Sequence, residues 1–149
     1  MFERYTEKAR NAIFSARFEA SQYGAASIET DHLLLGLLQS DEALARRFLH
    51  SKESIDGIRK QIDAQTAIRE KTPISVDLPL SHECKRVLAG TAEEADGMKQ
   101  WNIGTEHLLL GVLREEQCGA ARLLQERGLR LAAVRNEIAR GNSAEAAGA

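Results

Sequence analysis

Aromatic residues, prolines and any excess of one charge are all scarce in this sequence of 149 residues. Aromatic side chains make up 5%, there are 2 prolines, and 20 basic against 22 acidic residues leave a formal net charge of −2. This near balance provides no bulk attraction to nucleic acid or to an anionic membrane. So few aromatic rings also argue against a base-stacking surface. We therefore expect neither a nucleic-acid partner nor a membrane partner.

Signals for targeting and for catalysis are absent as well. The charged opening MFERYTEKAR is followed by no hydrophobic segment of a signal peptide. The uninterrupted apolar runs are far shorter than the ~20 residues that span a bilayer. No GxxxxGK[ST], HExxH, paired CxxC or GxSxG motif occurs. We expect a cytoplasmic, soluble binding module that uses no cofactor, does not turn over ATP and is not an enzyme.

The cysteines and two of the histidines are the remaining candidates for metal or redox chemistry. Cys84 and Cys118 are far apart in apolar helical contexts, which favours buried thiols over a redox or metal pair. His32 and His107 stand at matching places in the first turns of short predicted helices, where we favour a capping or packing role. A small metal-dependent enzyme using both histidines is a competing interpretation, although the sequence places no further ligands beside them.

An internal duplication is the dominant feature of the chain. The segment IETDHLLLGLL (28–38) returns as IGTEHLLLGVL (103–113), at an offset of 75 residues. The same offset pairs Glu19 with Glu94 upstream and continues downstream through the third predicted helix. We therefore predict an all-α protein built from two copies of one four-helix unit.

Each copy is predicted to hold four helices. Thr6 caps the first helix, which Gly24 ends in a left-handed conformation, and Ser81 caps the equivalent helix of the second copy. Thr30 and Thr105 are predicted as N-caps of the short second helices. The remaining helices are expected over residues 42–50, 54–67, 119–127 and 131–140.

Two glycines and two prolines indicate how these helices pack and where the copies divide. Gly36 and Gly111 lie inside the second helices, where glycine costs about 1 kcal/mol relative to alanine, so we interpret them as points of close helix contact. Pro73 and Pro79 make EKTPISVDLPL an extended connector. We assign 1–72 to the first repeat, 73–141 to the second, packed together as one domain, and 142–149 to a flexible tail.

The doubled motif TDHLLLGLL and TEHLLLGVL resembles the Clp repeat domain family, the N-terminal domains of Clp-type AAA+ unfoldases, most closely of the ClpC type. The resemblance covers about residues 1–140. It implies a pseudo-twofold bundle of eight helices. It also implies a chaperone role in protein degradation, in which the domain receives protein substrates and adaptor proteins for a Clp ATPase ring and its peptidase. The alternative is a free-standing Clp-repeat accessory protein that acts on the Clp machinery in trans and regulates its assembly.

In ClpC-type members the resemblance further implies recognition of proteins phosphorylated on arginine. The acidic residues of the doubled motif, Asp31 and Glu106, would face the guanidinium group. A hydroxyl cap and a basic residue one turn later would hold the phosphate. The residues at these positions are Thr6 with Arg10 and Ser81 with Lys85. Asp31 is one methylene shorter than the glutamate usual in the family, and the alternative is that these polar residues only cap helices.

Two phenylalanines differ between the copies. Phe14 and Phe18 lie opposite the predicted core face of the first helix, and their mates are Ala89 and Glu93. A position that is aromatic in one copy and small or charged in the other does not belong to the shared core. Either the two rings close the interface between the repeats, or they form an exposed docking patch for a partner.

Overall fold

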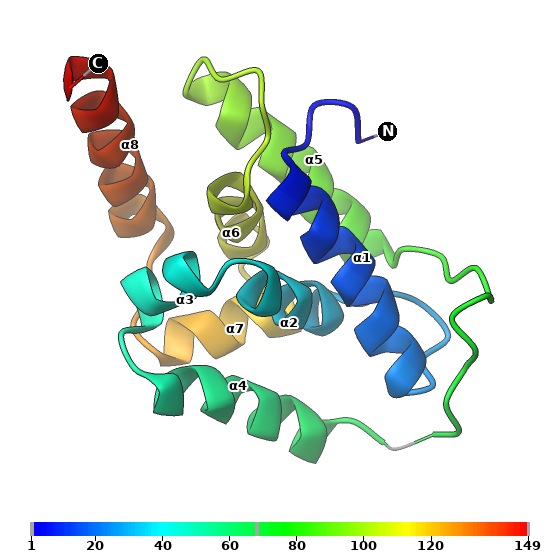
Figure 1. Cartoon of the computed structure of the whole chain (residues 1–149). Helices are drawn as coiled ribbons and strands as arrows, with labels where there is room; N and C mark the ends of the chain where they lie inside the picture. The colour runs from blue at the N-terminus through cyan, green and yellow to red at the C-terminus, as the bar shows by residue number, and fades with distance from the viewer. Residues whose placement is uncertain (1, 68, 149) are drawn as a thin grey trace.

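The structure is a computed structural model that describes residues 2–67 and 69–148, with residues 143–148 described by their backbone alone. The described chain folds into a bundle of α-helices, in which the connector before α5 passes along one side (Figure 1). The helices are α1 (Glu7–Gln22), α2 (Thr30–Ser40), α3 (Glu42–Leu49), α4 (Lys52–Gln65), α5 (His82–Gly97), α6 (Thr105–Arg114), α7 (Gly119–Glu126) and α8 (Leu131–Gly148). The predicted all-α duplication is confirmed.

Hydroxyl side chains start the two long first helices where the sequence predicts. Thr6 Oγ1 accepts a hydrogen bond from the N–H of Ala9 at 3.1 Å, and Ser81 Oγ accepts one from Cys84 at 3.1 Å. Gly24 follows α1 with a φ of +66°, the left-handed conformation that glycine adopts without strain. These three assignments are confirmed.

The prediction that Thr30 and Thr105 are N-caps is wrong. Both are the first residues inside α2 and α6, one position after the true N-caps. In each helix the backbone N–H of the N-cap residue donates at 2.9 Å to the Nδ1 atom of His32 or His107. Since both threonines stand inside the helix and do not cap it, their hydroxyls make contacts between the repeats: Thr30 Oγ1 accepts from the N–H of Ala120 and Thr105 Oγ1 donates to Asp41.

Gly36 and Gly111 lie at backbone-to-backbone contacts between helices. A Cβ atom added at Gly36 would lie 2.7 Å from the backbone nitrogen of Ala16 in α1, and one at Gly111 would lie 2.6 Å from the carbonyl oxygen of Val87 in α5. No side chain fits at such distances, so each motif helix packs directly on the first helix of its own repeat. The predicted close helix contact is confirmed at both positions.

Two short parallel backbone pairings join the repeats. Tyr5 pairs with Ile103, and Ile28 pairs with Leu80. These are equivalent positions in the two copies, because Tyr5 and Leu80, like Ile28 and Ile103, are separated by 75 residues. The repeats are therefore joined in a pseudo-twofold manner, and each first helix begins beside the second helix of the other repeat.

The last helix is longer than the sequence predicts. α8 reaches Gly148, whereas we ended it at 140 and assigned 142–149 to a flexible tail. The added part is rich in alanine, the residue with the highest helix propensity, which accounts for the extension. Ala149 lies outside the described residues, and flexibility of this segment stays a prediction.

The connector and the thiols agree with their predictions. The described residues of the connector between α4 and α5 contain no helix, as Pro73 and Pro79 predict. Cys84 and Cys118 are fully buried free thiols. Burial raises the pKa of Cys84 to about 12, so this thiol stays protonated and unreactive at neutral pH. None of the described helices combines the length and hydrophobicity needed to cross a membrane.

Candidate functional site

Two helix N-termini lie side by side where α1 meets α6. The N–H of Thr6 donates to the carbonyl oxygen of Ile103 at 2.9 Å, within the parallel pairing that precedes both helices. The chain therefore runs into α1 and α6 in the same direction, and the positive ends of two helix dipoles are neighbours. Thr6, Arg10 and Glu106 occupy the first turns of these helices. We call these three residues the α1/α6 site.

The side chains of the α1/α6 site remain accessible. Arg10 is exposed and forms no ion pair with the described residues. Thr6 Oγ1 accepts only the capping bond, so its O–H can still donate. The Glu106 side chain is 33% exposed and bends back over the start of its own helix, with Oε1 3.5 Å from His107 Nδ1. A hydroxyl, a cation, unpaired helix N–H groups and a carboxylate are thus available to one ligand.

The equivalent arrangement joins α5 to α2. The N–H of Ser81 donates to the carbonyl oxygen of Ile28 at 3.0 Å, which sets the N-termini of these helices side by side. Ser81, Lys85 and Asp31 form what we call the α5/α2 site. In each site the cap and the basic residue come from one repeat and the carboxylate from the other. The sequence predicted all three residue types in both repeats. It did not show that each site combines residues of both repeats.

Asp31 is less available than Glu106. Its Oδ1 atom is buried, accepts no hydrogen bond from the described residues and lies 2.7 Å from the position of a Cβ atom at Gly119. Burial raises the pKa of Asp31, and the neighbouring carboxylates of Glu29 and Glu83 raise it further. The carboxylate is therefore turned toward the start of α7. It borders a pocket of about 390 Å³ between the ends of α1 and α4 and the start of α2.

Comparison with known proteins identifies the family. Residues 4–127 match the family described as Clp repeat (R) N-terminal domain. The chain belongs to this family. The domain is 37% identical over 97% of its length to an ATP-dependent Clp protease ATP-binding subunit ClpA homolog of Guillardia theta, and 38% identical over all of its length to the chloroplastic chaperone protein ClpC1 of Oryza sativa subsp. japonica. It spans 18% and 16% of the length of these relatives.

Solved structures agree with this assignment. The N-terminal domain of the chaperone ClpD from Arabidopsis thaliana matches with a TM-score of 0.74 and 31% identity, covering 91% of this chain and 95% of that one. The N-terminal domain of Hsp104 from Candida albicans matches with a TM-score of 0.71 over 90% of this chain and 88% of that one. At 17% identity the second likeness concerns the fold alone.

His32 and His107 of this Clp repeat domain are structural. Nδ1 of His32 and of His107 accepts a backbone hydrogen bond, so this nitrogen carries no proton in either ring. The proton of His107 is therefore on Nε2, which donates to Gln100 Oε1 at 2.7 Å. Burial lowers the pKa of both imidazoles. The predicted capping role is confirmed. In the part of the chain that the structure describes, no three His, Cys, Asp or Glu side chains are grouped closely enough to hold a metal ion.

Phe14 and Phe18 do not close the interface between the repeats. Their side chains are 60% and 43% exposed on the outer face of α1. The core of the domain is built without them, as the mismatch with their repeat mates predicts. Of the two interpretations the exposed patch is therefore the one compatible with the structure, while docking of a partner stays a prediction.

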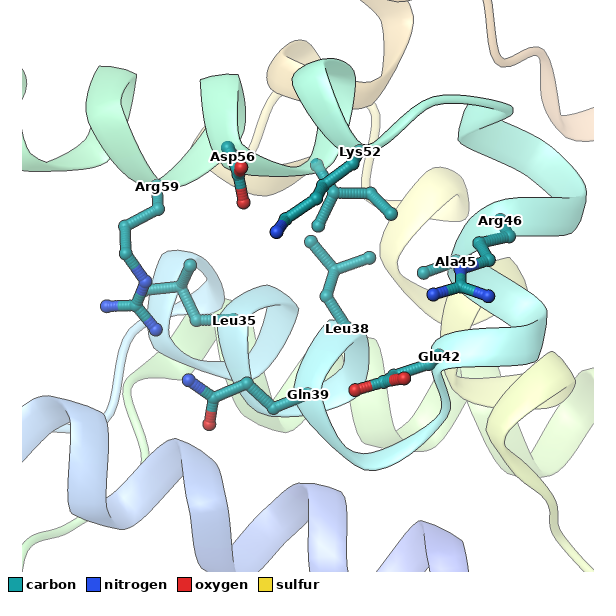
Figure 2. A pocket seen from close by; sticks show the side chains of 10 residues that line it. Leu35, Leu38, Gln39, Glu42, Ala45, Arg46, Lys52, Asp56 and Arg59 are labelled. Carbon is teal, nitrogen blue, oxygen red and sulfur yellow. The ribbon is translucent and has the colours of Figure 1, made fainter.

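A pocket between α2, α3 and α4 contains none of the predicted site residues. Figure 2 shows Leu35 and Leu38 between charged side chains of two helices, with Lys52 pointing inward from α4 and Glu42 and Arg46 on α3. The pocket has a volume of about 390 Å³. Because side chains of both signs surround it, its charge selects no class of ion, and we assign it no ligand.

Proposed function

We propose that this chain is the substrate- and adaptor-docking domain of a Clp-type ATP-dependent unfoldase and protease system, and that it binds arginine-phosphorylated proteins. The observation that carries the proposal is the crossed pairing at the α1/α6 site. It sets Thr6, Arg10 and Glu106 beside two helix N-termini. The phosphate of a phosphoarginine would lie against the helix N–H groups, Thr6 and Arg10, and Glu106 would accept hydrogen bonds from the guanidinium N–H groups.

The α5/α2 site is the weaker of the two in this proposal. Ser81 and Lys85 offer a similar phosphate cradle, but the shorter Asp31 side chain is turned toward Gly119. Binding a guanidinium there would require the carboxylate to leave its buried position. We therefore assign the main contribution to Glu106.

Calorimetry with free phosphoarginine tests the assignment. Glu106→Ala should weaken binding roughly ten- to hundredfold, since a charge-assisted hydrogen bond contributes about 1.5–3 kcal/mol. Asp31→Ala should weaken it less. Arginine and inorganic phosphate, offered separately, should bind more weakly than phosphoarginine because each supplies only half of the contacts. Absence of phosphoarginine binding to the wild type would remove this ligand and leave the docking role open.

The partners follow from the family and stay proposals. We expect protein substrates, adaptor proteins and a Clp ATPase ring with its peptidase, in cis when an ATPase follows in the same chain and in trans for a free-standing accessory protein. The sequence of the native reading frame after Ala149 distinguishes these two forms. A cytoplasmic location is part of the proposal, and the similar relatives include chloroplastic proteins.

We also propose that the chain is a binding module without catalytic activity of its own. Its two candidate sites present two hydroxyls, two cations and two carboxylates at helix ends, and the sequence contains no phosphate-binding loop for ATP. A coupled ATPase assay should show no turnover above the buffer blank. Turnover that survives a second purification would contradict this.

A further inference from the structure

Four exposed apolar side chains gather on α1 and the connector. Phe14 and Phe18 are 60% and 43% exposed, and Ile74 and Val76 are 45% and 43% exposed. One guanidinium nitrogen of Arg17 donates to the carbonyl oxygens of Ile74 at 2.9 Å and Val76 at 3.2 Å, which ties the connector to this part of α1. Grouped apolar side chains in water mark interaction surfaces, whereas scattered ones do not.

The two phenylalanines continue the line that the α1/α6 site begins. Thr6, Arg10, Phe14 and Phe18 follow each other at intervals of four residues, so they lie along one slowly rotating line on α1. At a rise of 1.5 Å per residue this line is about 18 Å long. We call it the α1 track. One half of it is suited to an anion and the other half to apolar groups.

The second repeat provides an internal control. The equivalent positions on α5 are Ser81, Lys85, Ala89 and Glu93, so the polar half is kept and the apolar half is missing. Glu93 is instead paired with Arg114. Since both copies have the same fold, the aromatic pair is not required for folding. It is an addition to α1 alone.

We propose that the α1 track binds an extended substrate segment in which apolar residues stand two and four positions from a phosphoarginine. Along α1, Phe14 and Phe18 lie about 6 and 12 Å beyond Arg10. An extended chain advances about 3.3 Å per residue and points alternate side chains to one face, so residues two and four positions away reach these rings. This inference rests on the proposed function of the α1/α6 site.

A second copy of the chain fits this surface less well. The four apolar side chains expose on the order of 300–400 Å², given the size of such side chains. A stable dimer buries about 800 Å² on each partner. A short peptide segment needs no more area than these four side chains and the polar half of the track offer together. The exposed Arg10 matches an anionic group at one end of such a segment.

Fluorescence anisotropy with synthetic peptides tests the proposal. One peptide carries leucine two and four residues after a phosphoarginine, a second carries the leucines before it, and a third has serine at those places. We expect one of the leucine peptides to bind at least tenfold more tightly than the serine peptide. The variant Phe14→Ala with Phe18→Glu, which copies the second repeat, should abolish this difference and still bind free phosphoarginine.

Two controls keep the outcomes distinct. Thermal melts should show that the double variant is folded, and Ile74→Ser with Val76→Ser removes the exposed apolar side chains of the connector beside the track and should weaken the leucine peptides without changing α1. Equal affinities of all three phosphorylated peptides, with normal phosphoarginine binding, would overturn the track alone. If the wild type does not bind phosphoarginine, both the proposed function and the proposal for the α1 track are overturned. Concentration-dependent dimers that the double variant abolishes would show that the patch serves self-association instead.

Discussion

At the scale of single residues, the two motif carboxylates occupy different surroundings. Asp31 has a buried oxygen without a hydrogen-bond donor among the described residues, whereas the Glu106 side chain is 33% exposed. Burial and neighbouring carboxylates raise the pKa of Asp31, so its ionised form is less favourable in the folded chain than in the unfolded one. The ionised Asp31 therefore lowers the free energy of unfolding.

Asp31→Asn should therefore increase the free energy of unfolding by about 1 kcal/mol at pH 7. The gain should shrink as the pH falls through the native pKa of Asp31, because the wild-type carboxyl is then neutral too. Urea unfolding at pH 7 and pH 4 measures both effects. The matched Glu106→Gln change should stay within about 0.5 kcal/mol of wild type. A destabilised Asp31→Asn variant would mean that the negative charge serves the start of α7.

His32 and His107 predict a second dependence on pH. Their pKa values are lowered in the folded chain by burial, while unfolded histidine titrates near 6.5. The unfolded chain therefore binds more protons as the pH falls below about 6.5, and the free energy of unfolding should decrease between pH 7.5 and pH 5.5.

Replacing both histidines tests this origin of the pH dependence. His32→Gln with His107→Gln should flatten the curve, because glutamine keeps an acceptor at the third helical position without titrating. The exposed His50 is a control, and His50→Gln should leave the slope unchanged. If the free energy of unfolding of the double variant depends on pH as steeply as that of the wild type, groups other than these two histidines cause the dependence. Urea unfolding at several pH values supplies the comparison.

At the scale of helices, the backbone contacts of α6 with α5 leave no room for a side chain. Gly111→Ala should lower the free energy of unfolding by about 2 kcal/mol or more, because the new Cβ atom would meet Val87 O and Thr91. Gly97→Ala is the matched control, since nothing lies within 4 Å of a Cβ atom there. It should be neutral or stabilising by up to about 1 kcal/mol. Equal melting temperatures of the two variants would contradict close packing at Gly111.

How much of this could be predicted from the sequence depends on the range of the interaction. The caps Thr6 and Ser81 are local signals with local causes, and the structure confirms them. Gly36 and Gly111 were predictable as well, because a glycine inside a predicted helix indicates close contact with another helix. The sequence placed the starts of α2 and α6 wrongly because threonine is a favoured N-cap residue. Only the geometry shows that a histidine in the first turn accepts the hydrogen bond of the N-cap N–H. The length of α8 was underestimated because small polar residues suggested a tail, while alanine favours a helix.

The crossing of the candidate sites was beyond local reasoning. Pairing of Tyr5 with Ile103 and of Ile28 with Leu80 depends on contacts between residues far apart in the chain. A signal does exist, since an apolar residue of this kind precedes all four helices at matching positions. Its meaning depends on which segment it pairs with, and periodicity within one helix carries no information about that.

At the scale of the whole molecule, the duplication also explains two ion pairs in which a buried carboxylate binds a partly exposed arginine. Glu19 binds Arg59, with 2.6 Å between Arg59 and Glu19 Oε1, and Glu94 binds Arg135 at 2.8 Å. Each pair links the first and fourth helices of one repeat. Both arginines occupy equivalent positions once the extra residue of the second copy is counted. The repeats thus conserve an internal brace, while contacts between them use a different set of groups.

The contacts between the repeats predict that neither repeat folds alone. Thr105 Oγ1 donates to Asp41 Oδ2 at 2.7 Å, and leucines of both copies, including Leu37 and Leu109, line one small apolar pocket at the seam. A separated repeat would expose this apolar face of its motif helix to water. It would also lose the backbone pairing that precedes its first helix. A four-helix unit of about 70 residues has little stability to spare for such losses.

Fragments 1–72 and 73–149 should therefore each show little helical circular dichroism, and an equimolar mixture should regain much of it. The whole chain should unfold in a single transition that coincides when followed by helical circular dichroism and by the fluorescence of Trp101. A chain ending at Asn142 is the control for truncation itself and should keep that transition, because it retains both repeats. A cooperative melt of fragment 1–72 on its own would show that the repeats are independent domains. The crossed α1/α6 site would then be an interface between two folded units, since Thr6 and Arg10 come from one repeat and Glu106 from the other.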